Sequence, residues 1–382
     1  MVLTGRDCGL GERAPMCGVP YYSCEAYIAR LIDRGYKVAI CEQTEDPATA
    51  KGIVKRDVVR IITPGTVMED AMLEAGTNNY LASVYIRGNE CGLSFIDAST
   101  GAVTVTSISG DGFESRLISE LGRFSPSEVI INDSYKIYSS LVALLKENLS
   151  CRVSEYPDKA FENSANGNEI VRQFKVFSVE ELELAAGSVD TAALDFAVKY
   201  LLENGMDKFG GADKIKHYSS LGFMALDISS VRNLELVETM RGKSKKGSLL
   251  WVLDKTKTAM GKRLLRSWLI QPLLSPIEII ARHNAVDEIF SDTVLRGEMT
   301  EYLTGIFDIE RLMTRVVYGV ANPKELQSLA RTISRFAPLK QLLQTANCKM
   351  LKEIEGDIDV LEDVAARIEE TICDEPPISM KD

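Results

Sequence analysis

The segment Arg241–Lys246 has residue types that could bind a phosphate. It reads Arg-Gly-Lys-Ser-Lys-Lys, and Gly242-Lys243-Ser244 looks like the end of a P-loop. A P-loop also needs a glycine five residues before Gly242, so that backbone N–H groups surround the phosphates, but position 237 is Val. A strand must precede the loop, whereas the pattern over 229–241 predicts a helix. We therefore exclude this nucleotide site and expect no cofactor bound by the chain itself.

The same run is a candidate DNA contact. Lys243, Lys245 and Lys246 lie close together between two predicted helices. Lysine side chains attract phosphates without reading sequence. A charge run in such a place is more often a solvated linker. At the level of the sequence both interpretations stay open.

Cysteine and histidine spacing predicts no metal centre. The histidines, His217 and His283, are far apart, and no two cysteines form a CxxC pair. The cysteines are at positions 8, 17, 24, 41, 91, 151, 348 and 373. We expect reduced, mostly buried thiols and a cytoplasmic location. So few histidines also argue against acid–base catalysis that depends on them.

The composition limits the function classes. The chain has 382 residues, 45% of them hydrophobic, which is enough for two or three domains. A net charge of −11 does not fit a protein whose whole surface binds nucleic acid, so DNA contact would come from a local basic patch. No apolar run reaches the length of a membrane span and no signal-peptide pattern is found, so we expect no membrane contact.

The elements that would position these residues begin with a short α/β stretch. We predict no element in Met1–Arg13, a helix from Ser23 to about Arg34 that ends at Gly35, and strands over Tyr36–Cys41 and Asp57–Ile62. Thr63-Pro64-Gly65-Thr66 is typical of a turn.

Residues 67–185 are predicted to form an α/β unit. The expected elements are strands Leu81–Ile86, Cys91–Ile96 and Ala102–Ser107, helix Phe113–Phe124, strand Glu128–Ile131, helix Tyr135–Leu149 and strand Cys151–Ser154. This order is like the ribonuclease H fold. A nuclease of that type needs a metal-binding carboxylate in its first strand, and Leu81–Ile86 has none. Asp97 ends the second strand nearly alone, so we interpret it as a solvated residue.

Residues 186–382 are predicted to be helical. The expected helices are about 179–186, 188–204, 229–241, 248–254, 258–270, 276–291, 293–304, 308–318, 323–346 and 357–372. Capping boxes at Ser178, Ser275 and Asn322 support three of the starts. No fixed-period repeat is found, which disfavours a solenoid.

Gly247–Leu273 is the most informative helical segment. Its apolar residues recur at helical spacing, and Lys262, Arg263 and Arg266 fill the other face. One interpretation is a buried amphipathic hairpin with Trp268 between helices. The specific residues also resemble MutS proteins, the DNA mismatch-repair clamps, where this segment links a connector domain to two lever helices. The residues that carry this resemblance are Gly247, Leu253, Asp254, Thr258, Gly261, Arg263, Leu264, Arg266, Trp268, Leu269 and Pro272.

Two other segments resemble MutS in the family's order. Residues 15–66 resemble the second half of its mismatch-binding domain, and Phe307–Leu312 followed by Ala321-Asn322-Pro323 resembles its helical core. The resemblance implies that Arg6 and Arg56 face DNA phosphates and that Met16 lies near the groove. The alternatives are solvated arginines and a core position for Met16. In the family a Phe-x-Glu element wedges beside the mismatched base, and none precedes Pro15.

The resemblance implies a multidomain protein with α/β and all-α parts. Residues 1–66 would be part of a mismatch-binding domain, 67–185 a ribonuclease H-like connector, and 186–382 an incomplete helical core and lever domain. We expect an internal fragment of a MutS protein, since the family's returning core, clamp and ATPase find no counterpart here.

The parent protein would bind mismatched duplex DNA as a homodimer through regions absent from this chain. It would use ATP and Mg²⁺ and contact downstream mismatch-repair proteins through the connector. This piece would link the DNA site to the ATPase, with no catalytic, cofactor or metal site of its own. The alternatives are a ribonuclease H-like, metal-dependent nuclease and a non-catalytic helical interaction module.

Overall fold

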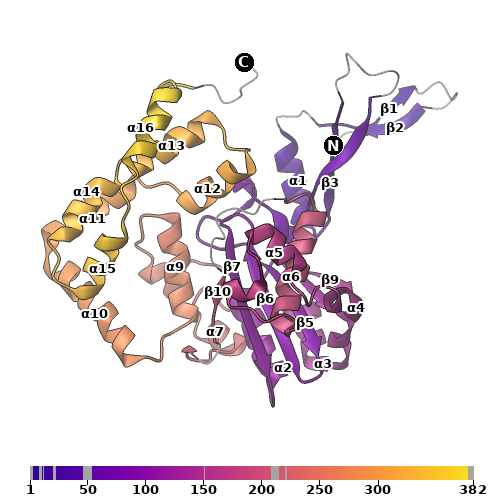
Figure 1. Cartoon of the computed structure of the whole chain (residues 1–382), viewed down its shortest axis with the longest axis horizontal. Helices are drawn as coiled ribbons and strands as arrows, with labels where there is room; N and C mark the ends of the chain where they lie inside the picture. Colours follow the sequence, from indigo (N-terminus) through magenta and orange to yellow (C-terminus); the bar gives the residue numbers. More distant parts are fainter. Residues whose placement is uncertain are drawn as a thin grey trace.

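The computed structural model describes residues 3–7, 11, 13–19, 23–45, 54–149, 151–207, 215–219 and 222–376. The chain is a mixed α/β protein. Figure 1 shows a central sheet with the N-terminal strands at its upper end and an arc of helices beside it. No helix within the described ranges is both long and apolar enough to cross a membrane.

Two antiparallel hairpins flank helix α1 (Cys24–Ile32). β1 (Leu3–Asp7) pairs with β2 (Arg13–Cys17), and β3 (Val38–Gln43) pairs with β4 (Arg56–Ile62). The first hairpin corrects the prediction of no element in Met1–Arg13. Its apolar residues do not alternate toward a core, and Leu3 is 75% exposed, so the sequence lacks the period-two signal of a half-buried strand.

The central sheet has the strand order β10-β7-β6-β5-β8-β9. Its strands are β5 (Leu81–Arg87), β6 (Glu90–Asp97), β7 (Ala102–Ser109), β8 (Glu128–Asn132), β9 (Arg152–Tyr156) and β10 (Lys216–His217). β5, β6 and β7 run antiparallel, and β8 and β9 run parallel to β5. The strands predicted over 81–154 are all present. The predicted helix Tyr135–Leu149 is instead a 3₁₀ turn, the short helix α3 (Ser139–Ala143) and a π-helical turn.

Helices cover both faces of the sheet. α2 (Phe113–Phe124) packs on one face, together with α3. α6 (Val189–Glu203) covers the other face and is buried along nearly its whole length. Its first residue approaches β6 so closely that a Cβ at Gly92 would lie 2.0 Å from the Val189 carbonyl oxygen. Two short helices, α4 (Asp158–Glu162) and α5 (Asn168–Phe174), lie between β9 and α6 in the chain.

The position of α6 corrects the predicted boundary at residue 185. α6 and β10 follow that boundary in the chain but pack on or pair with the sheet. The sequence of α6 is apolar around the helix, which is also what a helix in an all-α core would show. Only the three-dimensional arrangement places it in the α/β unit.

A buried carboxylate joins the N-terminal region to the sheet. Glu128, the first residue of β8, is fully buried. Its side chain accepts hydrogen bonds from the Thr63 hydroxyl, from the Gly65 N–H at 3.1 Å and from the Tyr200 hydroxyl at 2.7 Å. Lys37 lies 3.9 Å away. Because these donors balance the cost of burying the carboxylate, the turn at 63–66 is held against β8 and α6.

The helical part follows the sheet. It consists of α7 (Ile228–Asn233), α8 (Leu249–Leu253), α9 (Ala259–Ile270), α10 (Pro276–Ser291), α11 (Thr293–Thr304), α12 (Ile309–Tyr318), α13 (Pro323–Ile333), α14 (Phe336–Gln344), α15 (Lys349–Asp357) and α16 (Glu362–Thr371). The capping box at Asn322 is present, but Ser178 makes no side-chain cap. The predicted helix 323–346 is split at residues 334–335. Pro338 has no N–H to donate to the carbonyl of Ser334, so one continuous helix is disfavoured there.

Candidate functional site

The N-terminal candidates for DNA contact lie on exposed strands. Met16 is in β2, and its side chain is 47% exposed, so the alternative of a core position is wrong. Arg56 begins β4, is exposed, and pairs through its backbone with Gln43. Arg6 lies in β1 opposite Ala14, but its side chain is outside the described part of the structure.

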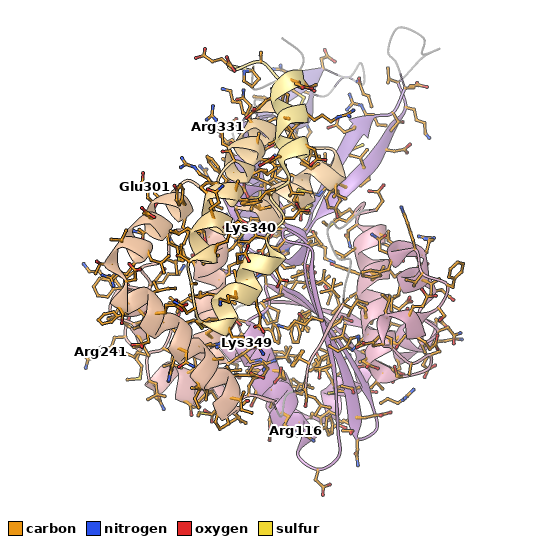
Figure 2. All side chains as sticks on the ribbon, turned by 60° about the vertical axis from the view of Figure 1, so that its left-hand side comes forward. Arg116, Arg241, Glu301, Arg331, Lys340 and Lys349 are labelled. Atoms are coloured by element: carbon orange, nitrogen blue, oxygen red, sulfur yellow. The ribbon has the colours of Figure 1, made fainter. Side chains whose placement is uncertain are left out.

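The lysines at 243–246 differ in their surroundings. All three are exposed. Lys245 forms an ion pair with Glu74, which partly neutralises its charge. Within the described ranges we find no ion pair for Lys243 or Lys246. The run is also far from the N-terminal strands: Figure 2 labels Arg241, its first residue, in the lower left of the view, whereas the N-terminal strands lie at the top. The structure therefore does not gather the predicted DNA-contact residues into one patch.

Helix α9 departs from the predicted assignment of its two faces at four residues. Arg263 was expected on a polar outer face but is only 6% exposed, and Arg266 is half-buried. Leu264 is 53% exposed and Trp268 39% exposed. The guanidinium group of Arg282 stacks 3.7 Å from the Trp268 ring. The interpretation of a buried hairpin with Trp268 between helices is therefore wrong, because α9 buries Arg263 and leaves Leu264 and Trp268 exposed.

The other residues of the Gly247–Leu273 segment shape its turns. Gly247 has a φ of +102°, a left-handed conformation that favours glycine, and it precedes the N-cap of α8. Asp254 accepts hydrogen bonds from the N–H and hydroxyl of Thr256 between α8 and α9. Thr258 caps α9 as predicted, accepting from the Gly261 N–H at 3.0 Å. The remaining three are an exposed Leu253, a half-buried Leu269, and Pro272, whose carbonyl accepts from Met224.

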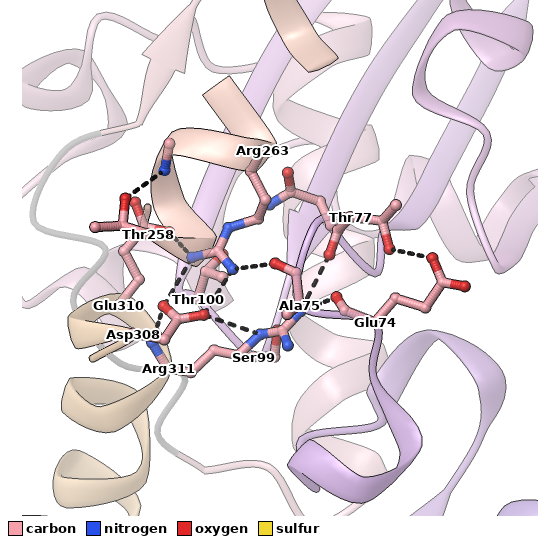
Figure 3. Close-up of polar contacts among 12 residues, drawn as sticks. Glu74, Ala75, Thr77, Ser99, Thr100, Thr258, Arg263, Asp308, Glu310 and Arg311 are labelled. Atoms are coloured by element: carbon pink, nitrogen blue, oxygen red, sulfur yellow. Dashed lines mark hydrogen bonds and ion pairs between the residues drawn. The ribbon is translucent and has the colours of Figure 1, made fainter. Parts of the chain in front are cut away.

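Arg263 is the centre of a buried polar cluster, drawn in Figure 3. Its guanidinium group binds the Asp308 carboxylate through two hydrogen bonds of 2.7 and 2.8 Å. A third hydrogen bond of 2.5 Å goes to Glu310, and a fourth of 3.1 Å goes to the Ala75 carbonyl. The planar guanidinium fork matches a carboxylate in this two-point manner, which a lysine cannot do.

Arg311 extends the cluster from the next helix. It belongs to the first turn of α12, and its side chain is 5% exposed. It donates to the carbonyls of Glu74 and Thr77, both at 3.0 Å, and lies 3.8 Å from Asp308. The segment 74–77, which connects the N-terminal region to β5, is thus held by arginines from two helices (Figure 3).

The charges in this arginine cluster, made of Arg263, Arg311, Asp308 and Glu310, balance one another. Burial lowers the pKa of the Arg263 guanidinium, but hydrogen bonds and charges from Asp308 and Glu310 outweigh it and hold the pKa above its ordinary value. The two arginines therefore stay positively charged and face two carboxylates. The cluster can pass a displacement from one element to another, but it cannot transfer protons. From the sequence, Phe307–Leu312 was singled out only because it resembles part of the helical core of MutS proteins. Helical periodicity gives no signal for a buried arginine.

The structure gives no support to a metal centre. Among the described residues, no three Cys, His, Asp or Glu side chains are close enough to hold a metal ion together. Asp97 is fully buried, which corrects its interpretation as a solvated residue. It accepts hydrogen bonds from Asn78, the Asn79 N–H and the hydroxyl and N–H of Ser99, so it organises the loops at the end of β6. The described cysteines are free thiols, but only Cys91 is fully buried, so the expectation of mostly buried thiols is wrong.

Comparisons with known proteins match the chain in three consecutive pieces. Residues 1–71 match the model for MutS domain I, residues 79–213 that for MutS domain II, and residues 229–382 that for MutS domain III. The arginine cluster joins the short segment between the first two pieces to the third.

Curated relatives match over the whole chain. The chain is 44% identical to the DNA mismatch repair protein MutS of Alkaliphilus oremlandii over 384 residues, which is all of this chain and 44% of that protein. It is 44% identical to the protein of the same name from Ruminiclostridium cellulolyticum, covering 43% of it. It is 42% identical to that of Lachnoclostridium phytofermentans, covering 41%. The chain thus spans less than half the length of these relatives. With three domain models in order and this identity from end to end, the chain belongs to the MutS family.

Proposed function

We propose that this chain acts in DNA mismatch repair, as the part of a MutS protein that links a mismatched-DNA site to an ATP-driven motor. The observation that carries the proposal is the arginine cluster, which binds the segment between the first two domains to helices of the third. A displacement of the DNA-binding end would move segment 74–77, and the arginine cluster would transmit that displacement to α9 and α12. Packed and ion-paired elements of this kind can couple distant sites.

The parts of this proposal have different supports. The strand order β7-β6-β5-β8-β9, with helices on both faces, supports a ribonuclease H-like connector. The family match over residues 229–382 supports a core and lever role for the helices. ATP and Mg²⁺ would be used by another part of the protein, since residues 1–382 contain no P-loop pattern. Homodimer formation and contacts of the connector with downstream repair proteins belong to the same proposal.

The DNA contacts within this chain would be electrostatic. Arg56, on an exposed N-terminal strand, is the charged candidate whose side chain is described, and Arg6 is a second. The uncharged Met16, also exposed, would lie near the groove. Lys243 and Lys246 are less favoured because they lie far from these strands, and Lys245 is the least favoured because Glu74 partly neutralises its charge. Phosphate attraction carries no mismatch information, whereas mismatch recognition needs a side chain wedged between bases.

A titration with paired and mismatched duplexes tests the proposal. We expect weak binding at low salt, equal for both duplexes and largely lost at physiological salt. Arg56→Gln should weaken it further, whereas Arg331→Gln, an exposed arginine on α13, should not. A preference for the mismatch that survives added salt would show that residues 1–66 contain the recognition element. Binding that is unaffected by Arg56→Gln would remove Arg56 from the interface.

A further inference from the structure

Two adjoining cavities lie beside helix α9 and share the side chain of Arg266. The first, of about 250 Å³, lies between α9 and the α/β unit and is lined by Arg123, Ser125, Arg263, Arg266 and Gln271, among others. The second, of about 340 Å³, is lined by Lys245, Lys255, Lys262, Arg266 and the acidic Asp254, among others. Cationic side chains from α2, from segment 245–255 and from α9 itself thus line these two cavities.

Arg266 lacks the partners that its neighbour has. Arg263, one turn earlier on α9, is bound by two carboxylates and one carbonyl. For Arg266 we find no hydrogen bond or ion pair within the described ranges. Glu74 and Glu238 act on Arg266 only through their charge, and Glu74 is already paired with Lys245. Burial lowers the pKa of the Arg266 guanidinium. A cation withdrawn from water without a partner is costly, and a bound anion would offset that cost.

Arg123 supplies a second guanidinium group to the first cavity. Its side chain is 9% exposed and forms an ion pair with Glu120. Its Nε atom is buried and has no hydrogen-bond partner. The rings of Phe124 and Tyr218 lie 4.8 Å from the guanidinium carbon and hold it in place. The cavity is therefore lined by a second guanidinium group in a fixed position, in addition to that of Arg266.

We propose that the cavity between α9 and the α/β unit is a binding site for a small phosphate anion, with Arg266 as its main ligand and Arg123 as the second. Guanidinium groups bind phosphate oxygens in pairs, which favours phosphate over a spherical anion such as chloride. A volume of about 250 Å³ is below the roughly 300–1,000 Å³ of pockets for drug-sized ligands, so phosphate or pyrophosphate fits better than a nucleotide.

Such an anion would act on the interface described above. It would bridge α2 of the α/β unit and α9, next to the arginine cluster, and so add a second connection between the same two parts of the protein. This inference does not depend on the proposed DNA contacts, because none of the N-terminal candidates lines the cavity.

The test is a calorimetric titration of the 382-residue chain with pyrophosphate and with inorganic phosphate, against sodium chloride of equal ionic strength. We expect saturable binding of pyrophosphate that weakens at least tenfold in Arg266→Gln. The matched control Arg331→Gln removes an exposed arginine, labelled in Figure 2 on the opposite part of the helical arc, and should bind as the unchanged chain does. Absence of saturable binding, or equal weakening in both variants, would overturn the proposal.

Two additions complete the design. Arg266→Lys keeps the charge but not the planar fork, and circular dichroism shows whether each variant folds. If Arg266→Gln does not fold, the pyrophosphate affinity of Arg266→Lys tests the proposal instead. Binding at least threefold weaker than in the unchanged chain supports the site, and unchanged affinity overturns it. A competition with a short DNA duplex identifies the source of the phosphate. Displacement of pyrophosphate by the duplex assigns the site to a nucleic-acid backbone, and no displacement assigns it to a free anion.

Discussion

Replacing Arg263 by methionine should loosen segment 74–77, which would keep only the hydrogen bonds from Arg311 to the carbonyls of Glu74 and Thr77. Methionine keeps much of the aliphatic volume of the side chain but removes all four hydrogen bonds to Asp308, Glu310 and Ala75. Two carboxylates would then face each other without their main counter-charge. The effect should be local, because Glu128 and the sheet core lie outside the cluster.

The size of the effect follows from the burial of each partner. Breaking a buried ion pair costs about 3–5 kcal/mol because the remaining charge is left unpaired. The side chain of Glu310 is 49% exposed, so its share is at most about 1 kcal/mol. Asp308 is 18% exposed and keeps Arg311 at 3.8 Å. We therefore expect the low end of the range, about 3 kcal/mol, or roughly a hundredfold in the opening equilibrium.

The assay is amide hydrogen exchange, because a protein of several domains need not unfold in one step. Peptides that cover residues 74–77 and the start of α12 should exchange roughly a hundredfold faster in Arg263→Met, because about 3 kcal/mol corresponds to roughly that factor in the opening equilibrium. Peptides from β5 and β6 should not change, and Arg331→Met is the matched control. Asp308→Asn keeps the N-cap of α12 but removes the charge. The effects of Arg263→Met and Asp308→Asn should be strongly non-additive. Unchanged exchange at 74–77, or additive effects, would refute the reasoning.

Two further predictions concern single side chains. Trp268→Ala should lower the free energy of unfolding by only about 1–2 kcal/mol, less than the roughly 3–5 kcal/mol expected for a core aromatic, because Trp268 is 39% exposed and loses mainly its contact with Arg282. Urea unfolding of this variant, compared with that of Trp251→Ala, checks the expectation. A loss above about 3 kcal/mol would contradict it. Burial raises the pKa of Asp195, and the amides of Ile170 and Glu169 offset this only in part. A carboxyl whose folded pKa is raised contributes stability at low pH and loses it as pH rises through that pKa. The melting temperature of the unchanged chain relative to Asp195→Asn should therefore rise as the pH is lowered from 7 toward 3.8, the ordinary pKa of an aspartate, and parallel curves would show that Asp195 is not the group.

The sequence was sufficient where the signal is local. The strands over 81–154 and the starts of α9, α10 and α13 were predicted because alternation, helical periodicity and capping residues act within a few positions. The family was recognised from segments whose specific residues occur in a fixed order. The break between α13 and α14 could have been predicted from Pro338, which lies three residues past it.

Tertiary structure decided which faces are buried. Periodicity separates apolar from charged positions on α9, but it assumes that the apolar face is the buried one. Here Asp308, Glu310 and the carbonyls of 74–77 come from distant parts of the chain and satisfy Arg263, so a charged side chain can be buried. The same holds for Asp97, which looked solvated until its donors from 78–79 and 99 were brought around it. A sequence shows which groups could pair, and only the fold brings together the partners that make burial of a charge affordable.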